Sequence, residues 1–176
     1  MLQNVPIFAG LDQAALELLW ERAVEDRIPS GTVIVREGEP GNRFYIVGQG
    51  KVSVCKKLGQ PGEVELATFG PTDFFGEMCI LETLPRCASV QAVVDTIVYS
   101  LTPLTFLHLY EVMPRQYSIL ILNIARDLSR RLRHVDEVFA SKTLSASLLL
   151  GAHGADRVET GGAHGGDHAG NDADGG

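Results

Sequence analysis

The chain has 176 residues, of which 45% are hydrophobic and 21% are charged, and its formal net charge is −7. This length suits one domain with a tail, and the hydrophobic fraction is enough for a packed core, which excludes wholesale disorder. The acidic balance argues against nucleic-acid binding driven by overall charge. No apolar run approaches the roughly 18 residues of a membrane span, and the N-terminus lacks a basic and hydrophobic leader, so we expect a cytoplasmic protein.

The first predicted element is an amphipathic helix over residues 11–24. Leu16, Leu19 and Trp20 recur at helical spacing, and Asp12 is a suitable N-cap. From residue 32 to 101 the hydrophobic period changes to two, and glycines separate the short β-branched or aromatic runs. This pattern favours an antiparallel roll or barrel over a parallel α/β sheet.

Helical periodicity returns from residue 115 to residue 140. Its apolar positions are spaced 4, 3, 4, 3, 4 and form a heptad seam, made of Ile121, Ala125, Leu128, Leu132, Val135 and Phe139. The seam either packs only on the roll or packs on the same helix of a second chain. We expect the second arrangement, a homodimer through residues 121–139.

Residues 141–176 form a predicted disordered tail, which becomes rich in glycine, alanine, histidine and aspartate after Leu150. Two weaker alternatives are a transition-metal site at His153, His164 and His168, and a calcium-binding fragment, GNDADGG. The histidine spacing fits no set metal motif, and calcium repeats need several stacked copies. We therefore predict no metal and no cofactor.

The most informative segment is residues 74–92, FFGEMCILETLPRCASVQA, which interrupts the strand period. Gly76 allows a backbone conformation that a side chain would block, and residues 77–81 can form one short helical turn. Arg86 can return to the same place with a planar charged fork that suits phosphate. Cys87 and Ala88 are small enough for main-chain amides to approach a ligand.

Glu77 beside a phosphate site needs an explanation, because its charge repels an anion. A carboxylate can accept a hydrogen bond from a sugar hydroxyl while Arg86 binds the phosphate, so the two residues together suit a ribose phosphate. The simpler alternative is a surface salt bridge between Glu77 and Arg86, which contributes little to stability.

These motifs resemble the cyclic nucleotide-binding domain shared by bacterial catabolite activator proteins, regulatory subunits of cyclic-AMP-dependent protein kinase and cyclic-nucleotide-gated channels. The phosphate-binding cassette of that family is similar to Phe75-Gly76-Glu77 followed by residues 85–90, PRCASV. Residues 28–54, IPSGTVIVREGEPGNRFYIVGQGKVSV, resemble the family's first hairpins. The resemblance covers about residues 5–138.

The resemblance implies an α+β fold: an antiparallel, jelly-roll-like β-roll with an N-terminal helix, a short phosphate-binding helix and a long C-terminal helix. This domain would span residues 1–140. In the implied site, Glu77 accepts the ribose 2′-hydroxyl with help from the Gly76 backbone, and Arg86 binds the cyclic phosphate with the amides of Cys87 and Ala88.

Further positions carry over with less support from the motif. The resemblance implies apolar walls for the purine or ribose at Val64, Leu66 and Met78, and a cap on the base from residues 132–136. Cys87 stands where many members have serine or threonine, which favours cyclic AMP over cyclic GMP. Val135 and Asp136 replace a Thr-Ser pair of the catabolite activator, so its base contacts do not carry over.

We therefore expect a stand-alone cyclic nucleotide sensor, in which binding shifts the long helix and alters dimerisation or docking to an unidentified effector protein. An enzyme is disfavoured because no nucleophile–base pair or metal triad can be assembled. Direct DNA binding is disfavoured because only 36 acidic, glycine-rich residues follow Ala140. The alternatives are a ligand-free interaction domain with an idle site, or a sensor of cyclic GMP or a cyclic dinucleotide.

The three cysteines, Cys55, Cys79 and Cys87, form no CxxC pair and predict reduced thiols rather than a disulfide framework. Cys87 follows Arg86 directly, so the positive field expected there can activate its thiol and make binding sensitive to oxidation. The alternative is that Cys87 only fills a position that requires a small residue.

Overall fold

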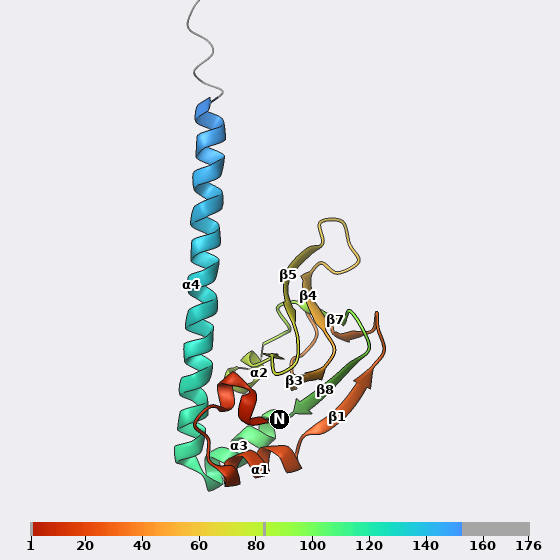
Figure 1. The fold of residues 1–176 in the computed structure, drawn as a ribbon, viewed down its shortest axis with the longest axis vertical. Coiled ribbons are helices and arrows are strands. Elements are labelled where there is room, and N and C mark those ends of the chain that lie inside the picture. The colour runs from red at the N-terminus through yellow and green to blue at the C-terminus, as the bar shows by residue number, and fades with distance from the viewer. Residues whose placement is uncertain (1, 83, 153–176) are drawn as a thin grey trace, which may run out of the picture. The chain divides into compact units, whose positions relative to one another are not determined.

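The computed structural model describes residues 2–82 and 84–152. The chain divides into two compact units, Met1–Arg131 and Leu132–Gly176. The first unit contains the β-roll with its helices, and the second contains the C-terminal part of the long helix (Figure 1). Within the described residues, no helix combines the length and the apolar character needed to cross a membrane.

The elements follow one another as helix, strands and helix. The N-terminal segment holds η1 (Leu2–Asn4), η2 (Pro6–Phe8) and α1 (Gln13–Glu21), and α3 (Pro103–Val112) and α4 (Pro114–Ala152) follow the roll. The roll itself contains β1 (Val24–Ile28), β2 (Val33–Val35), β3 (Phe44–Gln49), β4 (Val52–Lys56), β5 (Val64–Phe69), β6 (Phe74–Phe75), α2 (Met78–Leu81), β7 (Ser89–Ala92) and β8 (Thr96–Leu101).

Two four-stranded antiparallel sheets form the roll, with strand orders β1-β8-β3-β6 and β2-β7-β4-β5. Strand β3 is buried on both faces because its alternate side chains enter two different cores. Tyr45 and Val47 join the core between the sheets, whereas Phe44 and Ile46 join a second core under the helices. The predicted fold class, an antiparallel roll with helices at both ends and a short helix in the cassette, is confirmed.

The N-terminal helix is shorter than predicted. It spans Gln13–Glu21 and begins at Asp12, whose carboxylate accepts a hydrogen bond from the Ala15 amide at 2.9 Å. The chain then turns into strand β1, which starts at Val24 and which the sequence pattern does not indicate. Pairing with β8 explains this strand, because cross-strand neighbours outweigh its mixed, highly charged composition.

Helix α4 extends past the predicted end at residue 140. It continues to Ala152, so residues 141–152 are helical where a disordered tail is expected, and the rest of the tail lies outside the described residues. Leucine and alanine are common in this stretch and favour helix. The two weaker alternatives for the tail, a transition-metal site and a calcium-binding fragment, also fall outside the described part of the chain.

The heptad seam of α4 has two different environments. Ile121 and Leu128 are half-buried and pack against the core under the helices, as in the alternative where the helix packs on its own roll. Ala125 and Leu132 are exposed. Only part of the predicted seam is therefore available to a second chain.

Candidate functional site

The cassette begins where strand β6 ends. Gly76 has a φ of +78°, a left-handed conformation that glycine adopts without strain. The chain then forms the single turn of α2, in which the Ile80 amide donates to the Glu77 carbonyl at 3.0 Å and the Glu82 amide to the Met78 carbonyl at 2.9 Å. This turn falls where residues 77–81 predict it.

Arg86 is fixed at both its backbone and its side chain. Its amide donates to the Glu39 carbonyl at 2.8 Å, and its carbonyl accepts from the Gly38 amide at 2.9 Å. Its Nη2 donates to the Arg43 carbonyl at 2.6 Å, and its guanidinium lies over the Tyr45 ring, 5.8 Å from the centroid. The loop between β2 and β3 therefore positions the cation that the sequence assigns to phosphate.

Gly76 leaves the space that the Arg86 side chain occupies, and Gly41 lies beside it. A Cβ on Gly76 would lie 2.5 Å from Arg86 Nη1 and 2.8 Å from the Arg43 carbonyl oxygen, and a Cβ on Gly41 would lie 3.4 Å from Arg86 Nε. Real Cβ atoms do not approach other heavy atoms within 3.0 Å. Gly76 thus serves both the turn of the backbone and the placement of the guanidinium.

Glu77 is almost fully buried, with 6% of the residue exposed. Its Oε1 lies 3.2 Å from Arg131 Nη1 of α4. The salt bridge between Glu77 and Arg86 that the sequence left open as an alternative is absent among the described residues. The buried carboxylate is instead paired with a helix 54 positions further along the chain.

Arg131 makes several contacts with the roll. Its guanidinium lies 5.1 Å from the Phe74 ring centroid and 5.6 Å from that of Phe69, and its Nε lies 2.7 Å from Asp127 Oδ2 within the same helix. No sequence pattern singles out Arg131 as a site residue. Arg131 lies in a run of arginines on α4, and nothing in that run separates it from Arg130 or Arg133.

The other predicted site residues vary in exposure. Ala88, directly before β7, is buried, and Cys87 is exposed. Val64, Leu66 and Met78 are exposed, so their role as walls of a site stays a prediction. The predicted cap at residues 132–136 belongs to the second unit and also stays a prediction.

The cysteines differ in their surroundings. Cys55 is buried, and its Sγ lies 3.2 Å from Ser53 Oγ. Burial raises the pKa of the Cys79 thiol, against a smaller lowering by Arg86. Cys87 is therefore the most accessible of the three thiols. Among the described residues, no cluster of histidine, cysteine, aspartate or glutamate is able to hold a metal ion.

Comparisons with known proteins identify the family of this chain. Residues 25–112 match the family model of the cyclic nucleotide-binding domain. A CRP-like cAMP-activated global transcriptional regulator of Mycobacterium tuberculosis is 33% identical over 95 residues, which cover 54% of this chain and 42% of that protein. The chain thus spans less than half the length of that relative.

Solved structures share the fold. The catabolite activator protein of Thermus thermophilus has a TM-score of 0.68 and 32% identity, covering 78% of this chain and 63% of that one. The regulatory domain of Toxoplasma gondii PKA, crystallised with cAMP, has a TM-score of 0.57 and 31% identity, covering 61% and 41%. The chain belongs to the cyclic nucleotide-binding domain family.

Proposed function

We propose that this domain is a regulatory sensor that binds cyclic AMP at Glu77 and Arg86 and reports binding through α4. The observation that carries the proposal is the buried carboxylate of Glu77 paired with Arg131 of α4, beside an arginine positioned between two glycines. Arg86 would bind the cyclic phosphate, with the amides of Cys87 and Ala88, and Glu77 would accept the ribose 2′-hydroxyl.

The Glu77–Arg131 contact supports a mechanism for the output. A ribose hydroxyl that donates to Glu77 adds a donor next to the Arg131 guanidinium, so ligand and helix share one carboxylate. Any resulting change in the Glu77–Arg131 contact changes how α4 is held against the roll, and nucleotide binding would shift the helix in this way. The shift would alter dimerisation or docking to an effector protein.

The exposed apolar residues of α4 support self-association. Leu122 and Leu132 are more than half exposed, and Ala125 between them is also exposed, at spacings of 3 and 7. This stripe shares Ala125 and Leu132 with the predicted seam. Its residues are exposed, whereas Ile121 and Leu128 of the seam pack against the core under the helices. A homodimer through this part of α4 would bury the stripe.

Thermal unfolding with added nucleotides tests the proposal. A ligand at 100 times its Kd adds about 2.7 kcal/mol to the free energy of unfolding. We expect cyclic AMP to raise the Tm more than cyclic GMP or a cyclic dinucleotide at equal concentration. A chain that none of the three stabilises would have an idle site.

Substitution of Arg86 tests the site itself. A hydrogen bond to a charged group contributes about 1.5–3 kcal/mol, so Arg86→Ala should weaken cyclic AMP binding about tenfold to over a hundredfold. The matched control is Arg115→Ala, which removes an exposed arginine at the start of α4 and should leave binding unchanged. Equal affinity of Arg86→Ala and the parent chain would refute the site assignment.

A further inference from the structure

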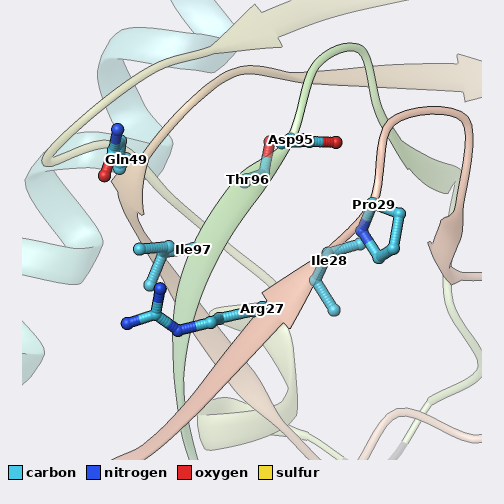
Figure 2. Close-up of a pocket in the computed structure, with 7 residues that line it drawn as sticks. All are labelled: Arg27, Ile28, Pro29, Gln49, Asp95, Thr96 and Ile97. Atoms are coloured by element: carbon cyan, nitrogen blue, oxygen red, sulfur yellow. The ribbon is translucent and has the colours of Figure 1, made fainter.

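The outer face of the first sheet is only partly covered by helices. Phe44 and Leu101 on this face pack in the core under α1, α3 and α4. Further along the same strands, Arg27, Ile97 and Gln49 lie side by side in register on β1, β8 and β3. They line an open hollow of about 350 Å³ together with Ile28, Pro29, Asp95 and Thr96 (Figure 2).

An aromatic pair lies further along the same face of the sheet. Tyr99 lies two residues after Ile97 on β8 and therefore on the same face. Its ring lies against Gly48, where a Cβ would come within 2.5 Å of Tyr99 Cε2. The Trp20 ring of α1 packs on it with a centroid distance of 4.9 Å, and Trp20 is 44% exposed.

A second hollow lies on the α1 side of this pair. It has a volume of about 260 Å³ and is lined by Leu2, Gln3, Gln13, Leu16, Glu17 and Trp20. Trp20 lines this hollow, and its ring contacts the ring of Tyr99. Tyr99 is two residues from Ile97, which lines the first hollow. We call the two hollows with the Trp20–Tyr99 pair the Trp20 surface. It shares no residue with the proposed nucleotide site.

Three glutamates lie near the aromatic pair in the sequence or the sheet. Glu17 precedes Trp20 by three residues on the same face of α1 and accepts a hydrogen bond from Gln13 Nε2 at 2.8 Å. The exposed Glu21 lies one helical turn after Glu17. Neither has an ion-pair partner among the described residues. Glu25 accepts a hydrogen bond from the Tyr99 hydroxyl at 3.1 Å and pairs with Arg27 at 3.0 Å.

An indole face next to unpaired carboxylates suits a cationic side chain. Tryptophan gives the strongest cation–π attraction of the aromatic residues, and the aliphatic stems of lysine and arginine pack well on aromatic rings. A second copy of this chain is a poor occupant, because a symmetric contact would place these carboxylates against one another.

We propose that the Trp20 surface docks a partner protein through an extended segment that carries lysine or arginine. The basic group lies between the Trp20 face and the carboxylates of Glu17 and Glu21, its stem packs on the Trp20–Tyr99 pair, and adjacent side chains occupy the hollows. Docking here does not require the nucleotide site.

The chain contains a single tryptophan, so the indole N–H signal of Trp20 in a proton–nitrogen NMR spectrum reports on this surface alone. We would titrate the full chain with a synthetic decapeptide of alternating lysine and leucine, and with its glutamate–leucine counterpart. We expect a saturable shift of the Trp20 signal with the lysine peptide only, weakened by added salt.

Two double variants separate this site from general attraction to an acidic protein. Glu17→Gln with Glu21→Gln should raise the Kd of the lysine peptide about twofold to thirtyfold, because two exposed charge pairs are lost. Glu82→Gln with Glu111→Gln changes the net charge equally at exposed positions elsewhere and should leave the Kd unchanged.

Three results would overturn the proposal. The first is the absence of a saturable Trp20 shift with the lysine peptide. The second is an equal loss of affinity in both double variants, which would show attraction by net charge only. The third is a Trp20 signal that shifts with protein concentration alone, which would assign the surface to a second copy of the chain.

Discussion

Gly76→Ala tests the geometry of the site with the smallest possible change. The added methyl group would lie 2.5 Å from Arg86 Nη1 and 2.8 Å from the Arg43 carbonyl oxygen. The arginine side chain can move, but the carbonyl belongs to the backbone and also accepts the 2.6 Å hydrogen bond from Arg86. Relief of the clash therefore has to break that hydrogen bond and move the guanidinium.

The expected cost has two parts. A non-glycine residue at φ +78° costs about 1–2 kcal/mol in backbone strain. Loss of the hydrogen bond from the charged guanidinium adds about 1.5–3 kcal/mol, reduced because a displaced Arg86 regains contact with water. We expect the free energy of unfolding to fall by about 2–4 kcal/mol and the affinity for cyclic AMP to fall at least tenfold.

Gly31→Ala is the matched control. Gly31 has a φ of +80° and open space where its Cβ would be, so this variant has the backbone strain without the clash. Denaturant unfolding and isothermal titration calorimetry on both variants separate the two parts. The reasoning is refuted if Gly76→Ala binds cyclic AMP as tightly as Gly31→Ala, or loses no more stability.

Three further predictions concern α4 and the thiols. Arg131→Ala leaves the buried Glu77 carboxylate without its cation and should lower the free energy of unfolding by about 1–3 kcal/mol. In a double-mutant cycle, adding Glu77→Gln to Arg131→Ala should recover part of that loss. Leu132→Asp places like charges in the proposed dimer contact, so light scattering should report a monomer. An unchanged dimer mass would show that the interface lies elsewhere. A parent chain that is monomeric with and without nucleotide would refute the dimer. Brief iodoacetamide treatment should label the exposed Cys87 before the buried Cys55. If Cys87 is labelled at the same rate with and without saturating cyclic AMP, the hypothesis that oxidation of Cys87 blocks binding is wrong, although the assignment of the site is unaffected.

The parts of the site that the sequence predicts are those built by neighbouring residues. The period of two, the glycine turns and the short turn after Gly76 depend on local backbone preferences, and local preferences are visible in a single sequence. Arg86 is only nine positions from Glu77, so one interrupted strand brings both into the cassette.

The contacts that the sequence does not predict join distant segments. Arg131 meets Glu77 only because the helices following β8 fold back over the roll, and an arginine in a charged helix looks the same whether it meets a carboxylate or water. The heptad seam has the same ambiguity. Apolar spacing shows that Ile121 and Leu128 need a partner, but it does not show that the partner is their own roll.

The burial of Glu77 constrains how binding and helix position can be related. A residue that is 6% exposed and carries a carboxylate needs a hydrogen-bond donor, and Arg131 supplies one here. A ribose hydroxyl bound as proposed is uncharged and donates a single hydrogen bond, so it would add to the Arg131 contact or displace part of it, without replacing the cation. In the proposed site, the affinity for nucleotide would in both cases depend on where α4 holds Arg131. Linkage then requires the converse: a partner that moves α4 must change nucleotide affinity by the same factor by which the nucleotide changes the affinity for that partner.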